Sequence, residues 1–492
     1  MSLGFSSKSS LETEALAYLR RESLDIYNRL HSIEEDISFV LRVREAYPQL
    51  AITPNLRCGA WYINPELAAK GPAYFKSTDG HYNGWSFNLR RPNLHLLPLA
   101  VAGHGMILVD STRSGKRLPD ALSKTIPIWC AVINRAVVLR ARMSKCGLNL
   151  EDWDVALYTP PGAVSSQERS QIELRLDQWA LDLANSSYVL PELPHPLHPF
   201  WITPASSTYP SLSQNAAFIP IVCVSASKQV HDGIERRSLG FAYIQGSGDD
   251  HELWGLGLTP QLFWRHKATL LGAERSELED RVRAVVADAS NFRPAASDSK
   301  GSGLTSISKI YGKIKLCRLD DLPDLGQVSS VPANLSFILL YPPSSELAES
   351  SQRVLSLSIP SGKKGQYDFL HQTLPQVLEF ATAQWRGDTE RREIVVGCRD
   401  GKDTSIGAAL ALLQAWFDDE GALRPNGATK QSIRTRLQWI IASRPVANPS
   451  RATLQRVNDF ILSRHFTPNR HVDGRKGTED ALQTSARTST GT

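Results

Sequence analysis

The stretch MILVDSTRSGKR, from Met106 to Arg117, determines the structure predicted for the first half of the chain. An apolar run ends at Val109, Asp110 follows it, and the chain then turns through hydroxyl side chains, Gly115 and three cations. A short apolar run is typical of a buried strand, and a polar, glycine-containing turn at its end suits a phosphorylated ligand. The stretch therefore predicts a strand that leads into a phosphate-binding turn. We expect it to lie in an α/β domain whose topology the sequence leaves open.

Positive charge is concentrated around this stretch. The segment from Lys70 to Lys145 contains twelve Lys or Arg and three Asp or Glu, which gives a local charge of +9. The whole chain of 492 residues carries only +5, so the remainder sums to −4. Such a concentration predicts an anionic partner more specifically than a mildly basic isoelectric point does.

The composition is that of a globular protein of two or three domains. Hydrophobic residues make up 41% of the chain, which is enough for ordinary cores. The six cysteines are scattered, without a CxxC pair or a Cys/His cluster at zinc spacing, so neither a disulfide framework nor a structural metal is indicated. The N-terminus lacks a signal-peptide core, and no uninterrupted run of about 18 apolar residues occurs. We therefore expect no membrane span and a cytoplasmic location.

The remaining segments give a coarse secondary structure. Apolar spacing predicts helices in residues 11–46, 167–184 and 273–286, and buried strands in residues 58–63, 218–225, 335–340 and 394–396. Residues 191–215 are rich in Pro and Ser and are predicted to form a loop. Composition predicts a first domain in residues 1–292, a linker in residues 293–309, a second domain in residues 310–466 and a disordered tail in residues 467–492.

A second polar cluster follows a predicted strand near Leu239. The sequence QGSGDDHE places Gly246 and Gly248 directly before Asp249 and Asp250. Loops at strand ends commonly carry functional side chains, so these carboxylates are candidates for a site. An exposed acidic loop is the alternative interpretation.

The second domain contains a recognisable loop, IVVGCRDGKDTSIG. A strand leads to Cys398, the chain turns at Gly401, and a helix begins near Thr404, so that backbone amides and a helix N-terminus form an anion site. The loop resembles the signature loop of cysteine-dependent, dual-specificity-type phosphatases. Those enzymes have an arginine six positions after the cysteine, where this chain has Thr404, and usually a histidine where it has Gly397. We expect a phosphatase-like α/β domain whose loop holds a phosphate of a large ligand or is only structural, with these candidate residues: Cys398, Arg399, Gly401, Lys402 and Ser405.

Longer motifs in both domains resemble the initiator-tRNA phosphoribosyl transferase family. The matching segments lie within residues 57–461 and are YFKSTDGH (Tyr74 to His81), LRRPNLHLLP (Leu89 to Pro98), VDSTRSGKRLPDALSKTIPIW (Val109 to Trp129), QGSGDDHELWGLGLTP (Gln245 to Pro260), CRDGKDTSIG (Cys398 to Gly407) and ANPSRATLQRVNDFI (Ala447 to Ile461). The resemblance implies a catalytic first domain that transfers a 5-phosphoribosyl group from phosphoribosyl pyrophosphate to the 2′-hydroxyl of adenosine 64 of initiator tRNA. This modification marks the tRNA against use in elongation.

The implied reaction assigns roles to the polar clusters. Bond breaking builds positive charge on the sugar and negative charge on pyrophosphate, which carboxylate-bound Mg²⁺ would offset. The candidate magnesium ligands or hydroxyl binders are Asp110, Asp249 and Asp250. The attacking hydroxyl needs a base, for which Asp79 or His81 is the candidate, although a lone histidine is more often a packed or surface residue. The candidate donor-binding residues are Lys76, Thr112, Arg113, Gly115, Lys116 and Arg117.

Binding of tRNA is expected to use a broad basic surface. Position 64 lies in a helical stem, which proteins recognise mainly by shape, phosphates and 2′-hydroxyls. Candidate backbone contacts are Arg90, Arg91, Lys124, Arg135 and Arg140, together with Arg399 and Lys402, and Tyr82 or Trp85 is a candidate for stacking on a base. Two other functions are open from sequence, a phosphatase that acts through Cys398 and a non-catalytic tRNA-binding protein.

Overall fold

The computed structural model describes residues 6–463 with gaps at residues 56–57, 70, 114, 144–152, 213–215, 232–233, 239, 292–302, 323–333, 344, 346–347, 386–391 and 425–426. The chain divides into two compact units, Met1–Ser297 and Asp298–Thr492. The division falls within the segment predicted as a linker, residues 293–309, of which residues 293–302 lie outside the described part of the chain. The predicted tail, residues 467–492, also lies outside it.

The first unit is built on a parallel four-stranded sheet. Its strands are β1 (Ala51–Pro54), β2 (Met106–Asp110), β3 (Leu197–Ile202) and β4 (Ile219–Ser225), in the order β1-β2-β4-β3. β2 and β4 are central and every residue in them is buried, which explains their continuous apolar runs. Because the strands are parallel, their carboxyl ends share one edge, where Asp110 lies opposite Ser225. The predicted phosphate-binding turn begins at this edge, where α/β sheets commonly bind ligands.

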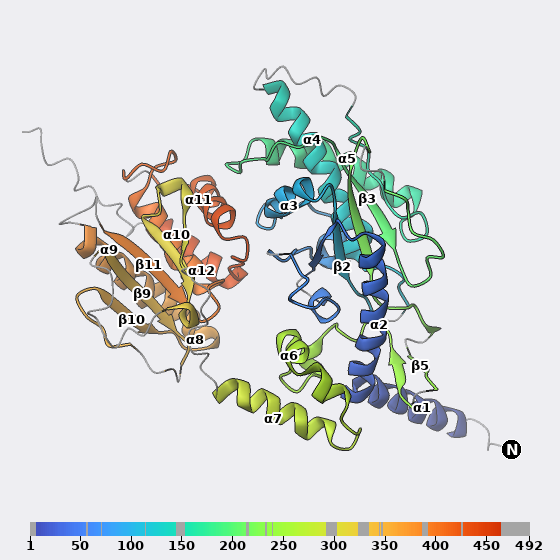
Figure 1. The fold of residues 1–492 in the computed structure, drawn as a ribbon. Helices are drawn as coiled ribbons and strands as arrows, with labels where there is room; N and C mark the ends of the chain where they lie inside the picture. The colour runs from blue at the N-terminus through green and yellow to red at the C-terminus, as the bar shows by residue number, and fades with distance from the viewer. Residues whose placement is uncertain are drawn as a thin grey trace, which may run out of the picture. The chain divides into compact units, whose positions relative to one another are not determined.

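Helices cover both faces of this sheet (Figure 1). One face carries α2 (Ile26–Ala46), α6 (Pro260–Leu271) and α7 (Leu278–Asn291), whose apolar side chains join the core formed by Val109 and Val224. The other face carries α3 (Leu97–Ala102) and α4 (Ile126–Met143), with α5 (Ser166–Ala184) packed on α4; α1 (Ser6–Leu24) precedes α2. The arrangement confirms the predicted α/β class.

Two segments of the first unit differ from the predicted secondary structure. β3 lies inside residues 191–215, for which the prediction of a loop is wrong. β3 is an edge strand, which accommodates Pro199 because one of its sides has no partner strand, whereas the central strand β4 has a proline, Pro220, only near its start. The apolar run from Cys58 to Ile63 is buried, but it contains the 3-10 helix Gly59–Trp61 instead of a strand. Here the chain passes so close to the end of β2 that a Cβ on Gly59 would lie 2.2 Å from the Val109 carbonyl oxygen.

The long apolar helix from Ala121 to Met143 is a core helix. It combines a π-helical turn, Ala121–Thr125, with α4, and its mean hydropathy of 1.3 would also suit a membrane span. However, 83% of that window is buried inside the protein, where α4 packs against β3 and α5. Burial within the first unit therefore accounts for the apolar composition of this helix.

The second unit is also α/β, with one five-stranded sheet. The strands are β7 (Thr305–Ser306), β8 (Ile314–Arg318), β9 (Leu335–Tyr341), β10 (Val354–Ser358) and β11 (Glu393–Cys398), in the order β10-β9-β11-β8-β7, and only β7 runs antiparallel to its neighbour. The helices are α8 (Gly362–Asp368), α9 (Leu374–Trp385), α10 (Thr404–Trp416), α11 (Lys430–Ser443) and α12 (Arg451–Ile461). The central strand β11 leads through Cys398 to the buried helix α10, as the loop motif predicts.

Candidate active site

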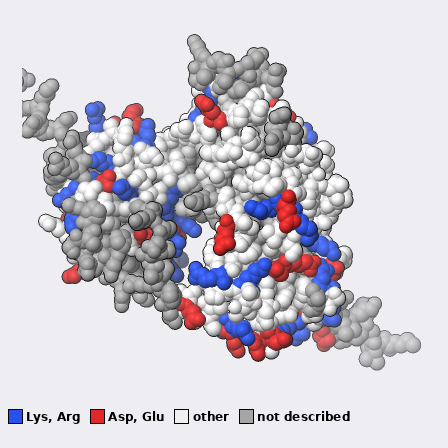
Figure 2. Space-filling view, viewed as in Figure 1, with Lys and Arg blue, Asp and Glu red and all other residues white. Residues whose placement is uncertain are grey.

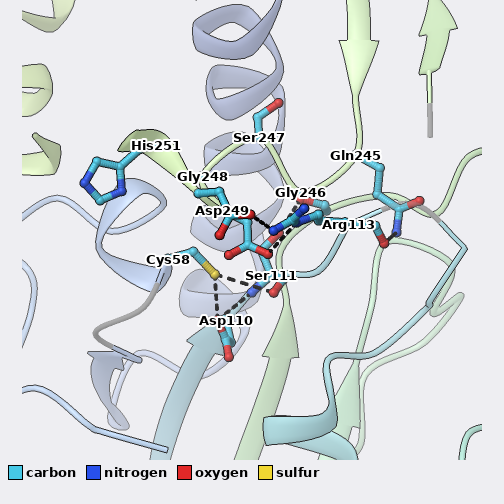
Figure 3. Close-up of polar contacts among 12 residues, drawn as sticks. Cys58, Asp110, Ser111, Arg113, Gln245, Gly246, Ser247, Gly248, Asp249 and His251 are labelled. Atoms are coloured by element: carbon cyan, nitrogen blue, oxygen red, sulfur yellow. Dashed lines mark hydrogen bonds and ion pairs between the residues drawn. The ribbon is translucent and has the colours of Figure 1, made fainter. Parts of the chain in front are cut away.

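Asp110, the last residue of β2, is fixed by three hydrogen bonds, of which Figure 3 shows those with Cys58 and Ser111. Its Oδ1 accepts from the Cys58 thiol at 2.7 Å and from the Ser111 amide at 2.9 Å, and its Oδ2 accepts from Asn55 Nδ2 at 2.8 Å. The residue is only 1% exposed. Burial raises the pKa of Asp110 to about 6, although the hydrogen bonds from Cys58 and Asn55 oppose the shift. Asp110 therefore anchors the start of the predicted phosphate-binding turn from inside the protein.

The buried Asp110 carboxyl should make the protein less stable as the pH rises from 4 to 7. Its pKa of about 6 in the folded state is above the ordinary value of 3.8, so the folded state binds more protons between these values and the free energy of unfolding falls through that window. The loss attributable to Asp110 should be on the order of 3 kcal/mol. Chemical denaturation at several pH values should show this loss for the native protein relative to Asp110→Asn. Parallel pH profiles for the two proteins would contradict the assignment.

The turn after Asp110 presents three cations to solvent. The side chains of Arg113 and Lys116 are 57% and 56% exposed. Arg117 is exposed as well, and its Nε and Nη2 each donate to Thr203 Oγ1 at 3.2 Å, at the end of β3. Gly115 lies between them with a φ of +86° and has open space around its Cα, so its backbone conformation is what favours glycine there. The predicted donor-binding cations thus lie together at the carboxyl edge of the sheet.

Gln245 forms hydrogen bonds with the backbone before and after Gly115 in this turn. It follows the antiparallel ribbon of β5 (Ile234–Arg236) and β6 (Ala242–Ile244). Its Nε2 donates to the backbone carbonyls of Arg113 at 3.0 Å and Lys116 at 2.7 Å, while its Oε1 accepts from the Val230 amide at 3.1 Å. One buried side-chain amide therefore sets the separation of the two carbonyls.

The loop from Gly246 to Asp250 packs directly on the turn. Gly246 has a φ of +69°, and a Cβ there would lie 2.5 Å from the Thr112 carbonyl oxygen. Asp249 Oδ2 accepts from Arg113 Nε at 3.2 Å (Figure 3), and Asp250 forms an ion pair with the same guanidinium. We call the turn that carries Arg113, Lys116 and Arg117 the cationic turn, and the loop from Gly246 to Asp250 the glycine loop. The structure brings these two segments together, although Arg113 and Asp249 are 136 residues apart in the sequence.

Asp120 connects the cationic turn to the predicted cluster around His81. Its Oδ2 accepts from Lys116 Nζ at 2.7 Å and lies 3.8 Å from His81 Nε2, while its Oδ1 lies 2.9 Å from Lys124 Nζ. Burial acts to raise the pKa of Asp120, but hydrogen bonds from Lys116 and Lys124 outweigh it and hold the pKa below its usual value. Backbone packing fixes the same junction, since a Cβ on Gly80 would lie 2.7 Å from the Asp120 carbonyl oxygen.

The two candidate bases have different surroundings. Asp79 forms an ion pair with Arg91 at 3.0 Å, and their side chains are only 14% and 10% exposed. The side chain of His81 is 56% exposed and faces Asp120. Lys76, the neighbouring donor-binding candidate, places its ammonium 5.7 Å from the centre of the Tyr74 ring. Of the two bases, His81 is the more accessible, and the carboxylate of Asp79 is already neutralised by Arg91.

Several side chains proposed as tRNA contacts are used inside the protein. Lys124 is 6% exposed and lies 3.2 Å from Glu168, and the 3% exposed Trp85 donates its indole N–H to the same carboxylate at 3.0 Å. This corrects the prediction that Lys124 and Trp85 contact tRNA, because a buried lysine paired with two carboxylates and a buried indole do not face a ligand. Arg140 donates to the Ala184 carbonyl at 3.0 Å, whereas Tyr82 is 63% exposed.

The remaining arginine candidates also have protein partners. Arg135 donates to the Val155 carbonyl at 3.2 Å and pairs with the exposed Asp177 at 2.6 Å. Arg90 is partly buried, and burial lowers its pKa, with the neighbouring charge of Arg91 acting in the same direction. Figure 2 shows positive and negative side chains interspersed on the face of the first unit that is drawn, so this face carries no uniform basic patch.

Of the three predicted magnesium ligands, two carboxylates could still bind a divalent cation. Among the residues that the structure describes, no group of three or more His, Cys, Asp or Glu is placed to hold a metal ion. The oxygens of Asp110 are occupied by its three hydrogen bonds. Asp249 and Asp250 remain, side by side at the cationic turn. Two carboxylates fit Mg²⁺, which commonly takes one or two from the protein and completes its shell with water and substrate phosphates.

The phosphatase-like loop of the second unit contains a carboxylate of its own. Cys398 Sγ lies 3.0 Å from Ser405 Oγ and 3.3 Å from Asp400 Oδ1. The same Asp400 oxygen accepts from the Lys402 amide at 2.9 Å. Lys402 and Arg399 are exposed. The carboxylate of Asp400 thus takes a backbone amide that a phosphate in such a loop would otherwise use.

A buried arginine supports this loop from another part of the chain. Arg444 Nε donates to the Gly401 carbonyl at 2.9 Å, and its Nη1 donates to Thr305 Oγ1 at 2.8 Å. Gly401 has a φ of +62°, and a Cβ there would lie 2.6 Å from Arg444 Nη2. Arg444 therefore braces the backbone of the loop, and Thr404 stays at the position of the phosphatase arginine as the first residue of α10.

Several residues that build the site are not apparent from the sequence. They are the buried partners Asn55, Cys58, Asp120, Glu168, Thr203 and Gln245. The signal available was weak. Asp120 follows Lys116 by four residues, the spacing of neighbours on a helix, and Gln245 opens the QGSGDD motif. The others lie far from their partners along the chain, so only the fold brings them together.

A parallel α/β unit with cations and paired carboxylates at the carboxyl edge of its sheet belongs to the class of α/β proteins whose ligand sites commonly lie at that edge. Comparison with known families identifies the family. Residues 19–287 match the family model described as the Rit1 N-terminal domain, and residues 353–461 match the Rit1 DUSP-like domain. The chain is 35% identical to an uncharacterized protein of Schizosaccharomyces pombe, over 89% of this chain and 94% of that protein. It is 32% identical to the tRNA A64-2′-O-ribosylphosphate transferase of Saccharomyces cerevisiae, over 90% of this chain and 93% of that enzyme. The chain belongs to the Rit1 family.

Solved structures that resemble part of the chain do so more distantly. Human DUSP28 is 14% identical, covers 34% of this chain and 97% of its own, and has a TM-score of 0.23. The Yvh1 phosphatase domain of Chaetomium thermophilum is 18% identical, covers 31% of this chain and 92% of its own, and has a TM-score of 0.24. The family match to a DUSP-like domain confirms the predicted phosphatase-like character of the second unit.

Proposed function

We propose that this chain transfers a 5-phosphoribosyl group from phosphoribosyl pyrophosphate to the 2′-hydroxyl of adenosine 64 of initiator tRNA, in the cytoplasm. The observation that carries the proposal is the cluster of Arg113, Asp249 and Asp250 at the carboxyl edge of the first sheet. The Saccharomyces cerevisiae relative is named for ribosylphosphate transfer to A64. Its alignment covers 90% of the present chain. Cations beside paired carboxylates suit a donor that carries a pyrophosphate group.

The cations of the turn would bind the donor and stabilise its leaving group. Cleavage of the bond between C1 of the ribose and pyrophosphate leaves negative charge on pyrophosphate. The cations Arg113, Lys116 and Arg117 would offset this charge, and their closeness to one another supports that role. Asp249 and Asp250 would hold Mg²⁺, which supplies further charge compensation for a pyrophosphate leaving group. Thr112 and Gly115 would present polar groups of the same turn to the donor phosphates.

His81 is the better supported of the two candidate bases. The attacking 2′-hydroxyl must lose its proton, and an accessible side-chain base within reach of it is suited to accept it. His81 is exposed and faces Asp120, which also holds Lys116, so the histidine is connected to the cationic turn through one carboxylate. Asp79 is less suitable, because Arg91 already compensates its charge.

The tRNA would be bound mainly through its backbone. Tyr82, Arg399 and Lys402 are the exposed candidates of the predicted set. Contacts with phosphates make affinity fall with salt and add little sequence preference. Selection of initiator tRNA by this chain would therefore depend on the shape of the stem around position 64.

A transfer assay tests the proposal directly. Purified full-length protein, Mg²⁺ and ribose-labelled phosphoribosyl pyrophosphate should move label into initiator tRNA and release one pyrophosphate per label. A matched tRNA with 2′-deoxyadenosine at position 64 lacks the nucleophile and should stay unlabelled. Tight binding of tRNA without labelling would favour a non-catalytic tRNA-binding protein, and labelling of the deoxy substrate would show that another position is modified.

The Cys398→Ser variant should transfer as fast as the native protein, within about twofold. The reason is that the loop lacks the arginine that would stabilise phosphate-ester hydrolysis, and Asp400 already takes one of its amides. Native protein should accordingly show no turnover of p-nitrophenyl phosphate. If the native protein hydrolyses this ester and Cys398→Ser abolishes the reaction, the chain is a cysteine-dependent phosphatase.

A further inference from the structure

The inner face of α2 carries polar side chains that accept hydrogen bonds from the backbone amides of β6, as a neighbouring strand would do. Asn28 Oδ1 accepts from the Ala242 amide at 3.0 Å, and Ser32 Oγ accepts from the Ile244 amide at 2.8 Å. Asp36, one helical turn further on, accepts from the Tyr243 hydroxyl at 2.7 Å. All three α2 residues are almost fully buried. The spacing of four residues therefore fixes the ribbon that leads to Gln245.

A chain of hydroxyl groups runs from the other oxygen of Asp36 to the site. Asp36 Oδ2 accepts from Ser227 Oγ at 2.6 Å, and Ser227 Oγ lies 2.7 Å from Ser111 Oγ. Ser111 Oγ accepts from the Tyr62 hydroxyl at 3.2 Å, and the oxygen of that hydroxyl accepts from the Gly248 amide at 2.8 Å. The chain thus links α2 to the residue that opens the cationic turn and to the glycine loop that carries Asp249.

The hydrogen bonds in this series of hydroxyl groups have one consistent direction of donation. The Gly248 amide can only donate, so the Tyr62 oxygen accepts and its proton goes to Ser111. Burial raises the pKa of Tyr62, so that proton is retained. Ser111 then donates to Ser227, and Ser227 donates to Asp36. Burial raises the pKa of Asp36, and the hydrogen bonds from Ser227 and Tyr243 act in the opposite direction by stabilising the carboxylate. Reversing the chain would leave the buried Tyr62 proton without the acceptor it has now, which is costly inside a protein.

We propose that Asp36 is a positioning residue for the reaction, because it ends this chain and thereby holds the cationic turn and the glycine loop in register. The inference rests on the proposed function for its kinetic consequence, while the geometry it asserts is independent of it. The residues that transmit the effect are Ser227, Ser111 and Tyr62. None of them needs to touch a substrate, and each is buried.

Two matched variants separate this role from a general loss of stability. Ser227→Ala interrupts the series of hydroxyl hydrogen bonds next to Asp36. Tyr243→Phe removes the hydroxyl from the other Asp36 oxygen, together with the acceptor of the Lys228 amide, and leaves that series intact. Both remove one buried hydroxyl from the same carboxylate. In Ser227→Ala, the KM for the phosphoribosyl donor should rise about tenfold and kcat should change less, since a misplaced turn binds the donor poorly. In Tyr243→Phe, the KM for the donor should stay within about twofold of the native value, at a similar melting temperature.

Hydrogen exchange of the free protein tests the geometry without any assay of transfer. The backbone amides of Thr112, Arg113 and Gly248 should exchange faster in Ser227→Ala than in Tyr243→Phe. The double variant Ser111→Ala/Ser227→Ala should exchange like either single variant, because the two hydroxyls act as one chain. Equal exchange in Ser227→Ala and Tyr243→Phe would overturn the inference. Faster exchange in a protein that transfers nothing would instead overturn the proposed function and leave the positioning role standing.

Discussion

Replacing Arg113 with alanine should lower kcat/KM for transfer by about 100- to 1,000-fold, the size of effect seen when one preorganised charge at a leaving group is removed. Lys116→Ala should behave in the same way. Affinity for tRNA should stay within a fewfold of the native value, because both side chains would bind the donor and not the RNA. Donor kinetics and tRNA binding by filter retention or calorimetry measure the two quantities separately.

Arg283→Ala is the matched control for this prediction. Its side chain is also 57% exposed, and it pairs with two acids, Glu279 and Asp280, on α7. It should leave both transfer and tRNA binding unchanged, since exposed pairs of this kind contribute little. Equal losses of transfer and tRNA affinity in Arg113→Ala would show that the turn binds tRNA and not the donor.

The Gly246→Ala variant should lose about 100-fold or more of its transfer rate, since small displacements of a positioned group are costly. The added methyl group would lie 2.5 Å from the Thr112 carbonyl oxygen, which no side-chain rotation can relieve, so the glycine loop or the cationic turn has to move. Movement of either one separates Asp249 from Arg113. Steady-state kinetics of transfer measure the loss.

Gly240→Ala isolates the backbone component of this effect. Gly240 has a φ of +85°, similar to the +69° of Gly246, but open space surrounds it. Its substitution should cost roughly 1 kcal/mol of stability through the left-handed conformation and leave the transfer rate unchanged. If the two alanine variants lose activity equally, the close approach of Gly246 to Thr112 has no role in the site.

The parts of the fold that the sequence predicted well are those whose signal is local. β2 and β4 are central and buried on both faces, so their apolar runs are continuous, and the polar turn after Asp110 follows directly. β3 gave no such signal, because it is an edge strand that is only partly buried and it lies in a segment rich in Pro and Ser. The run from Cys58 to Ile63 was misleading for the opposite reason, since it is apolar and buried without being a strand.

The site was predictable as two clusters, and their contact was predictable only through the family resemblance. The cations of the turn and the carboxylates near Asp249 each stand out in the sequence, but their pairing depends on a loop that returns across the sheet edge. Lys124 shows the limit of counting charges. It contributes to the local excess of +9, yet it is buried between Asp120 and Glu168. A count of cations cannot distinguish an exposed lysine that could bind a ligand from a buried lysine that is paired with carboxylates of the protein.

The pairing of Arg113 with Asp249 and Asp250, and of Lys116 with Asp120, also affects how the free protein behaves towards nucleic acid. Charges that are cancelled at short range produce little field at the distance of an approaching polyanion. The turn therefore exerts little long-range electrostatic attraction on RNA in general. A small polyanion that arrives with its own counterion can exchange partners with these acids, so the turn would stay accessible to the proposed sugar donor in a cell that contains much RNA.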